Sequence, residues 1–228
     1  MGIEAFVKAA TEVAKEVGKE TGNSIKSFDR RKPMENNTST GERFKTTEKD
    51  KRNVDVEKRI PNDKNFERKS NTEKLQNDCI DKAENDIGLE NLDSQARGNY
   101  AEMKVDRDLE KKGYERISNE AVTDLETPTG PGIDGVYTNK KTGETLIVET
   151  KFNKSELGNT LDGKQMSEAW IDNRLDSAVG KETADNIRMN SILNPDSVKS
   201  VLAKVDLNGI TAYSKLDSAA NIIGGIEL

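Results

Sequence analysis

The sequence contains no histidine among its 228 residues, and Cys79 is its one cysteine. The absence of histidine excludes Ser-His-Asp and Cys-His nucleophilic sites, histidine general bases and zinc sites built on histidine. A lone cysteine cannot form an intramolecular disulfide, so Cys79 is expected to be a structural thiol. Any catalysis must therefore rest on carboxylates, lysines and hydroxyls, an inventory that suits chemistry with a hard cation.

Apolar residues are also scarce. Hydrophobic residues make up 32% of the chain and charged residues 34%, a low apolar share for a globular protein. No apolar run is long enough to span a membrane, so no membrane segment is expected. Glu4, Glu12 and Glu16 interrupt the stretch where the apolar region of a signal peptide would lie, so no signal peptide is expected either. The scarcity indicates that only part of the chain builds a core.

The pattern along the chain predicts three segments. Residues 1–25 carry apolar residues at helical spacing, which predicts an amphipathic helix that docks on a core or, alternatively, acts as a docking or export element. Residues 26–94 are predicted to be a charged, largely disordered linker or entry segment, because scattered apolar residues cannot bury enough surface to offset the ordering entropy. Residues 95–228 have the pattern of a folded domain.

Helix and strand signals alternate within residues 95–228. The predicted helices cover 97–112, ended by Gly113, and 164–179, whose inward positions are Met166, Trp170, Leu175 and Ala178. The predicted strands cover 117–122, 133–137, 145–152, 201–207 and 210–216. Residues 138–144 form a hairpin turn signal, and Asn208-Gly209 is typical of a two-residue hairpin turn. This order predicts an α/β domain in which a small, mixed central sheet is flanked by helices.

One predicted strand, 145–152, carries charges at its C-terminal end. Because a strand alternates faces, Glu149 and Lys151 are expected to point the same way as Ile147. Charges on a central strand need partners or a metal ion. The preceding strand places Asp134 between Gly132 and Gly135, small neighbours that allow a close approach. The hairpin is therefore predicted to bring Asp134 near Glu149.

These side chains predict a site for a hard cation. Two carboxylates, Asp134 and Glu149, together with the backbone carbonyl of Thr150, suit Mg²⁺, Mn²⁺ or another divalent cation. Such a metal would lower the pKa of a bound water and stabilise charge on a phosphodiester, and Lys151 would orient or deprotonate that water. Glu102 shares a helix face with two apolar residues and is expected to aim at the same site.

Two further acidic residues of that helix, Asp106 and Glu110, are instead expected to face solvent.

The pattern of Gly132-Ile-Asp-Gly135, then Val148-Glu-Thr-Lys151, with Glu102 on an upstream helix, resembles the PD-(D/E)xK restriction-endonuclease-like superfamily. The resemblance covers roughly residues 95–216. It is strongest to the C-terminal nuclease toxin domains of bacterial polymorphic and contact-dependent inhibition systems. It implies metal binding by Asp134 and Glu149, catalytic assistance by Lys151 and support of the metal site by Glu102. Gln165 resembles a glutamine that often follows the core motif.

The resemblance implies a metal-dependent endonuclease that hydrolyses phosphodiester bonds, with DNA favoured over RNA because the superfamily mostly cuts DNA. It further implies a toxin that is secreted or delivered into the cytoplasm of a target cell, with a cognate immunity protein that protects the producer. Two alternatives remain open. In the first, the protein is a restriction or repair endonuclease of the producing cell. In the second, it is a non-catalytic phage or secretion-system component that retains the fold.

The charge of the predicted domain argues against a broad basic surface for nucleic acid. Residues 75–228 contain 18 basic and 28 acidic residues, a net charge of −10. Proteins that bind phosphates usually present a basic patch, because neutralised phosphates release counterions. Gln165 and Lys154 are the predicted substrate-binding residues, and Lys164 and Arg174 are further candidates along a phosphate path. A solvated surface explains the three basic residues equally well.

Overall fold

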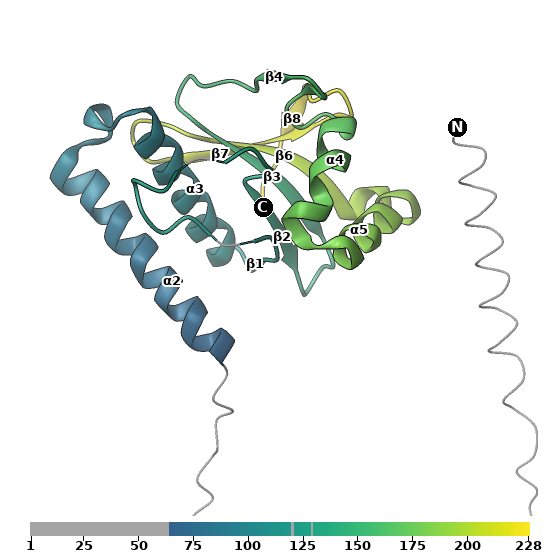
Figure 1. Ribbon diagram of the computed structural model, residues 1–228, viewed down its shortest axis with the longest axis horizontal. Helices are drawn as coiled ribbons and strands as arrows, with labels where there is room; N and C mark the ends of the chain where they lie inside the picture. The colour runs from purple at the N-terminus through teal and green to yellow at the C-terminus, as the bar shows by residue number, and fades with distance from the viewer. Residues whose placement is uncertain (1–63, 120, 129) are drawn as a thin grey trace, which may run out of the picture. The chain divides into compact units, whose positions relative to one another are not determined.

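The computed structural model describes residues 64–228 except Glu120 and Thr129, and Figure 1 shows their arrangement. The predicted helix over 1–25 and the predicted linker up to residue 63 lie outside the described residues. The described chain is an α/β fold with a mixed six-stranded sheet in the order β1-β2-β3-β6-β7-β8 and a separate two-stranded sheet, β4-β5. This architecture agrees with the predicted fold class.

The bounds of the elements are as follows. The helices are α2 (Lys64–Asp81), α3 (Ser94–Lys111), α4 (Glu168–Val179) and α5 (Lys181–Leu193). The strands of the large sheet are β1 (Tyr114–Arg116), β2 (Gly135–Asn139), β3 (Thr145–Phe152), β6 (Val198–Val205), β7 (Thr211–Leu216) and β8 (Ile222–Gly225). The small sheet contains β4 (Asn159–Thr160) and β5 (Gly163–Lys164). Short helical turns lie at Lys82–Ile87, Leu89–Asn91 and Pro195–Ser197.

Only β3 and β6 run parallel in the large sheet, and its other neighbouring strands are antiparallel. A parallel pair needs a crossover connection, and α4 and α5 lie in the connection between β3 and β6. Helix α3 covers one face of the sheet, with α2 packed on its outer side, and α4 and α5 cover the other face (Figure 1).

Strand β3 supplies side chains to both cores because its residues alternate between the two faces. Leu146 and Val148 are buried in the core on the α3 side. Ile147 is buried in the core on the α4 side, together with Trp170 and Leu175. The predicted alternation of this strand is therefore confirmed, and the bounds of β3 match the predicted strand 145–152.

The prediction of a largely disordered segment over 26–94 is wrong for residues 64–94. These residues form α2 and two short helical turns, and α2 packs along α3. Gln76 and Ala83 are fully buried there, and Leu89 and Leu92 join the core on the α3 side. Composition averages over a segment and misses a few well-spaced residues whose tertiary contacts stabilise a helix of weak intrinsic tendency.

Other predicted elements are shifted. The prediction of a strand over 117–122 is wrong for the described residues of that range, because the short strand β1 ends at Arg116. The second helix begins at Glu168 rather than at 164, because β5 and a turn precede it. Its predicted inward residues are buried: Met166, Trp170, Leu175 and Ala178. Helix α5 and strand β8 were not predicted. Within the described part of the chain, no helix is long and apolar enough to cross a membrane.

Candidate active site

The candidate site lies where β2 and β3 separate. The register of β2 against β3 runs only to the pair Gly135 and Val148, so Asp134 precedes β2 instead of lying within it as predicted. The Asp134 carboxylate occupies the edge of β3 that β2 no longer covers. There its Oδ2 accepts a hydrogen bond of 2.7 Å from the backbone N–H of Thr150. The end of the hairpin thus brings Asp134 directly onto the β3 segment that carries Glu149 and Lys151.

Glu149 and Lys151 lie side by side on one face of β3, as their spacing predicted. Lys151 Nζ is 2.7 Å from Glu149 Oε1, and the Glu149 side chain is 2% exposed. Glu149 Oε1 also accepts a 3.0 Å hydrogen bond from Gln165 Nε2. The other oxygen, Glu149 Oε2, is buried without a hydrogen-bond partner among the described residues. A buried carboxylate oxygen without a protein partner is uncommon, and it leaves an acceptor available for water or a cation.

Glu102 brings a third carboxylate to the same site from α3. Burial is the main reason that its pKa rises to about 8, and the charge of Asp134 adds to the rise. The pKa of Glu149 rises to about 8 for the same two reasons, in the same order. Burial also raises the pKa of Asp134, against the opposing effects of the Thr150 N–H, Lys151 and Arg116. Burial and mutual repulsion therefore disfavour the ionised form of these carboxyl groups in the absence of a bound cation.

The residues of the site meet the requirements of a divalent cation in part. Within residues 64–228, apart from 120 and 129, no three acidic or cysteine side chains form a complete metal-binding group. Mg²⁺, however, commonly binds one or two carboxylates and completes its shell with water and phosphate oxygens. The carboxylates of Asp134 and Glu149, together with the Thr150 carbonyl, match this mode of Mg²⁺ binding. The Oε2 atom of Glu149 is the carboxylate oxygen without a partner among the described residues. Glu102 lies close enough to add charge without being a required ligand.

Gln165 lies in the turn before α4, and not on the helix as predicted. Its two ends make different contacts. The Nε2 donates to Glu149, and the Oε1 accepts a 2.7 Å hydrogen bond from the backbone N–H of Gly158. Gln165 therefore links the β4-β5 segment to the Glu149 carboxylate and restricts the motion of both.

The basic residues predicted along a phosphate path differ in their surroundings. Lys154 is exposed just beyond the end of β3. Arg174 lies over the Trp170 ring, with 4.4 Å between the guanidinium carbon and the ring centroid, and pairs with Asp162 at 2.9 Å. Lys164 Nζ donates to the carbonyl of Ala220 at 2.7 Å. Arg174 and Lys164 thus have structural partners, and Lys154 is the member of this set with its side chain in solvent.

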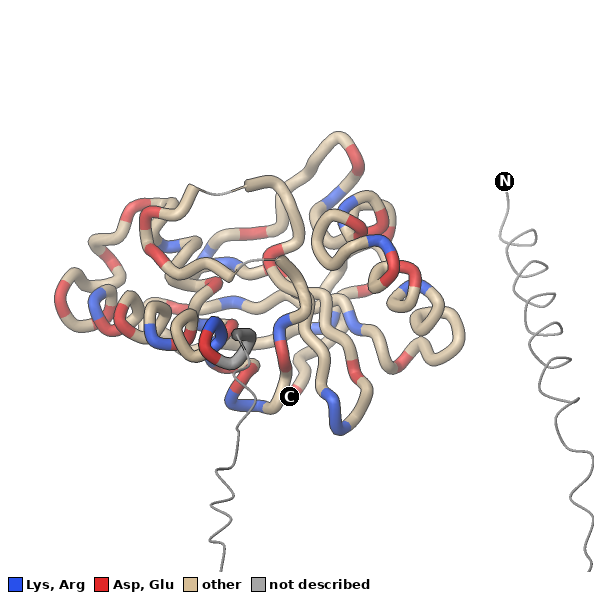
Figure 2. The backbone as a smooth tube through the Cα atoms, turned by 60° about the horizontal axis from the view of Figure 1, so that its bottom comes forward, with Lys and Arg blue, Asp and Glu red and all other residues tan. Residues whose placement is uncertain are grey.

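Basic and acidic residues are interleaved along the described chain and are not segregated by sign (Figure 2). A cavity of about 370 Å³ lies against Glu102 and Asp134, and Arg116 and Arg174 also line it. The cavity is large enough for a nucleotide-sized group and presents both carboxylates and guanidinium groups. A polyanion at this site would be held by local contacts, because the surrounding surface is not generally basic.

Sequence reasoning missed Arg116 and was wrong about Asp106. Asp106 is 4% exposed and pairs with Arg116 at 2.7 Å, where solvent exposure was expected. Its burial has a signal in the sequence: Asn99, Met103 and Asp106 recur at helical spacing, and all three are buried on α3. Arg116 carries no comparable signal, because its contacts join segments far apart in the chain.

Comparisons of the chain with protein-family models, with curated proteins and with solved structures found no match. An α/β sheet flanked by helices hosts many unrelated activities, so the fold class alone does not define a function. The function must be inferred from the geometry and chemistry of the site described above.

Proposed function

We propose that the protein is a metal-dependent nuclease that hydrolyses phosphodiester bonds, with its active site at Asp134, Glu149 and Lys151. The observation that carries this proposal is the cluster of buried carboxyl groups, Glu102, Asp134 and Glu149, where β2 and β3 separate. Glu149 Oε2 lies there without a partner among the described residues, beside a lysine at 2.7 Å. A structural ion pair does not need two further carboxylates nearby, whereas a divalent cation does benefit from them.

Asp134 and Glu149 would hold the cation together with the Thr150 carbonyl, and Glu102 would stabilise it by its charge. When bound, Mg²⁺ or Mn²⁺ supplies a water of lowered pKa and stabilises negative charge on the phosphodiester. Lys151 lies beside Glu149, where its ammonium group can orient a water and contact the phosphate. Gln165 keeps the Glu149 carboxylate in place through its 3.0 Å hydrogen bond. Lys154 is assigned to the substrate backbone.

The substrate assignment favours DNA over RNA through the resemblance to the restriction-endonuclease-like superfamily. The test is incubation of the full-length protein with supercoiled plasmid and, separately, with total tRNA, in Mg²⁺, in Mn²⁺ and in EDTA. Cleavage is expected with either divalent cation and not in EDTA. No cleavage of either nucleic acid under any condition would contradict the proposed enzyme and favour a non-catalytic component.

Matched variants test the location of the site. Glu149→Gln keeps the shape of the side chain and removes its charge, and Lys151→Met removes the ammonium group. Glu149→Gln is expected to abolish cleavage and Lys151→Met to slow it strongly. Glu182→Gln on α5 and Lys141→Met in the turn between β2 and β3 change exposed residues of the same types and should leave cleavage unchanged. Cleavage at the wild-type rate in Glu149→Gln and Lys151→Met would show that the active site lies elsewhere.

The narrower proposal is that this nuclease is an interbacterial toxin opposed by a cognate immunity protein. Its support is the resemblance of the Glu102, Asp134, Glu149 and Lys151 pattern to toxin nuclease domains. Expression in the cytosol of a bacterium should then be lethal, and expression of Glu149→Gln should not. Relief of toxicity by the product of an adjacent gene would support an immunity protein. Survival of cells that contain active nuclease would favour a restriction or repair endonuclease.

A further inference from the structure

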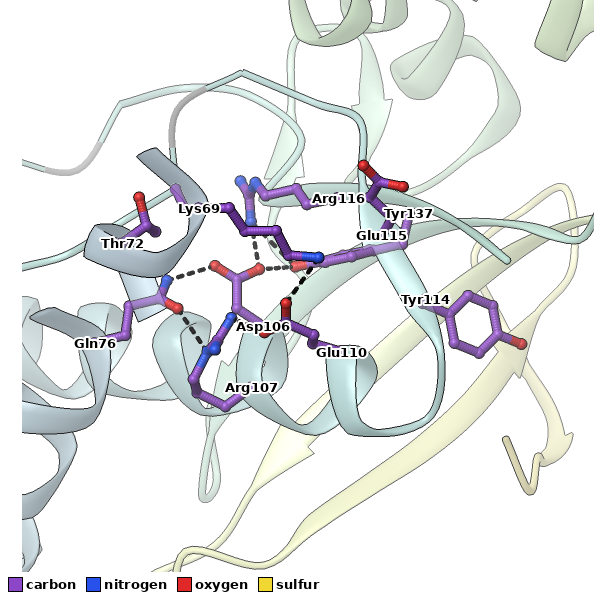
Figure 3. A pocket seen from close by; sticks show the side chains of 11 residues that line it. Lys69, Thr72, Gln76, Asp106, Arg107, Glu110, Tyr114, Glu115, Arg116 and Tyr137 are labelled. Carbon is purple, nitrogen blue, oxygen red and sulfur yellow. Dashed lines mark hydrogen bonds and ion pairs between the residues drawn. The ribbon is translucent and has the colours of Figure 1, made fainter. Parts of the chain in front are cut away.

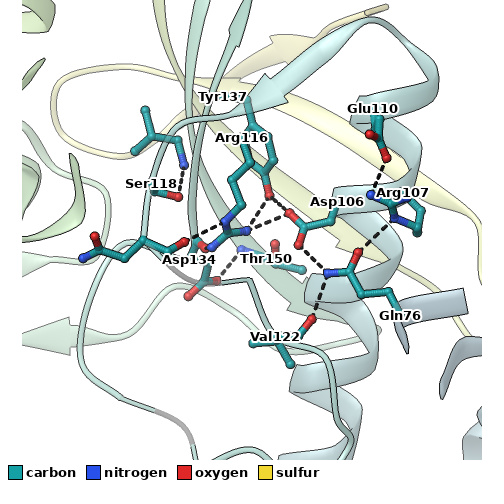
Figure 4. A network of polar contacts seen from close by, with 12 residues as sticks. Gln76, Asp106, Arg107, Glu110, Arg116, Ser118, Val122, Asp134, Tyr137 and Thr150 are labelled. Atoms are coloured by element: carbon teal, nitrogen blue, oxygen red, sulfur yellow. Dashed lines mark hydrogen bonds and ion pairs between the residues drawn. The ribbon is translucent and has the colours of Figure 1, made fainter. Parts of the chain in front are cut away.

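A second polar cluster lies next to the candidate active site and is centred on Arg116, the last residue of β1 (Figure 4). Arg116 NH2 donates to the backbone carbonyl of Asp134 at 2.5 Å. Arg116 NH1 donates to Asp106 Oδ1 at 2.7 Å and to the Tyr137 hydroxyl at 3.1 Å. One planar guanidinium therefore holds the backbone of a proposed metal ligand with one nitrogen and a buried carboxylate with another.

The partner of Arg116 is itself held from several sides. Asp106 Oδ1 also accepts a hydrogen bond from the Tyr137 hydroxyl, and its Oδ2 accepts one of 2.8 Å from Gln76 Nε2. Gln76 is fully buried on α2 and also donates to the carbonyl of Val122 at 2.8 Å. In Figure 3 Gln76 approaches the Asp106 carboxylate from the left and Arg116 approaches it from above. The chain of contacts runs from α2 through α3 and β1 to Asp134.

We propose that Arg116 is a positioning residue that fixes Asp134 for metal binding, and that Asp106, Tyr137 and Gln76 hold Arg116 in place. This inference rests on the proposed function, because it assigns Asp134 as a metal ligand. Asp134 is then anchored at two points, its backbone carbonyl by Arg116 and its carboxylate Oδ2 by the Thr150 N–H. Metal ligands need placement to within about 0.5 Å, and groups that contact the ligands supply it.

The guanidinium of Arg116 makes its contacts with Asp106 and with the Asp134 carbonyl at the same time, through two different nitrogens. A lysine at this position would retain a positive charge, but a single ammonium group lacks the planar fork that reaches Asp106 and the Asp134 carbonyl together. The conservative substitution therefore separates the contribution of charge from that of geometry.

The test measures the affinity of the full chain for Mn²⁺ alone, by electron paramagnetic resonance, below the unfolding temperature of each variant. Loss of a residue that supports metal ligands typically weakens metal affinity about 10- to 100-fold, and that range is expected for Arg116→Met. Arg116→Lys should give a smaller loss. Arg188→Lys and Arg188→Met are matched controls, because Arg188 makes similar contacts with Asp172, Asp176 and Asp185 on α4 and α5. Neither control should alter the affinity.

A purely structural role would lower the unfolding temperature of the Arg116 variants and leave the Mn²⁺ affinity of the folded protein unchanged. That outcome overturns the inference. If Arg116→Met does not fold, Arg116→Lys carries the test, and an affinity equal to that of the wild-type protein is then the contradicting result. The two proposals remain separable. Wild-type protein that binds Mn²⁺ but cleaves no nucleic acid contradicts the nuclease, whereas unchanged Mn²⁺ affinity in the variants contradicts only the positioning role.

Discussion

Two groups of buried acidic residues meet at Asp134, and their surroundings differ. Asp106 receives hydrogen bonds from Gln76, Arg116 and Tyr137, which satisfy both of its oxygens. Glu149 is as deeply buried, yet one of its oxygens has no partner within the described residues. Its pKa is raised to about 8.

This difference shows that burial of a carboxylate does not define its role. Both carboxylate oxygens of Asp106 accept hydrogen bonds from protein groups without any ligand, which is typical of a structural ion pair. Glu149 pairs with Lys151, but further carboxyl groups lie close to it and its Oε2 has no partner among the described residues. This combination is typical of a metal ligand. The number of buried carboxylates therefore says less about the role of each one than the number of hydrogen-bond donors around it.

The largest expected effect is on catalysis, through Lys151. Removal of a positioned acid–base group typically lowers the rate about 10²- to 10⁴-fold. Lys151→Met should lower the single-turnover rate constant of cleavage within that range. The measurement is single-turnover cleavage of plasmid at saturating Mg²⁺. Asp106→Asn is the contrasting variant: it keeps an oxygen acceptor for Arg116, so at saturating Mg²⁺ its activity should fall less than that of Lys151→Met. Equal losses in both variants would remove the distinction between the two groups.

The next effect is on the free energy of unfolding. Substitution of Asp106 should lower it, and substitution of Glu149 should raise it. Asp106→Ala leaves Arg116 buried without its partner, and breaking a buried pair in this way costs about 3–5 kcal/mol. Glu149→Gln in EDTA should instead stabilise the protein, because it removes one of three mutually repelling carboxylates. Urea unfolding at pH 8 measures both changes. A destabilised Glu149→Gln protein would indicate that the charge of Glu149 serves the fold.

A pH dependence should follow from the raised pKa values. The pKa values of Glu102 and Glu149 rise from about 4.5 to about 8 in the folded protein, so the folded state binds more protons than the unfolded state between those values. The contribution of these two groups to stability in EDTA should therefore be largest below pH 4.5 and be lost as the pH rises to 8. Glu149→Gln should flatten the profile measured by thermal unfolding. A metal-free protein that gains stability from pH 5 to pH 8 would contradict this expectation.

Added Mg²⁺ should oppose that loss of stability. A ligand that binds only the folded state stabilises it by about 2.7 kcal/mol at a concentration of 100 times its Kd. The gain should be present in the wild-type protein and in Glu182→Gln, and absent in Glu149→Gln. An equal gain in all three proteins would place the Mg²⁺ site elsewhere.

The smallest expected effect is that of Lys154. Because its side chain is exposed, Lys154→Ala should weaken substrate binding by a contact to one phosphate and leave kcat unchanged. Loss of one such contact reduces the slope of log K against log salt by about one unit. Binding of catalytically inactive Glu149→Gln protein to DNA in increasing salt measures the slope, with Lys141→Ala as the control. An unchanged slope would leave Lys154 as ordinary solvated surface.

Local patterns in the sequence determined the parts of the site that lie on one strand. The alternation of β3 predicted that Glu149 and Lys151 share a face, because successive side chains of a strand point to opposite sides. The hairpin signals predicted that Asp134 approaches them. Helical spacing predicted that Glu102 faces inward, and its charge does act on Asp134 and Glu149. Each of these inferences depends on residues near one another in the chain.

Only the tertiary structure decided the surroundings of those residues. The contact of Gln76 with Asp106 spans 30 positions, and that of Arg116 with Asp134 spans 18. Composition suggested disorder for residues 64–94, yet contacts with α3 hold them in helices. Local propensity cannot report such contacts, because their free energy arises when distant segments exclude water together. The residues of the candidate site were thus readable in the sequence, whereas the network that holds Asp134 was not.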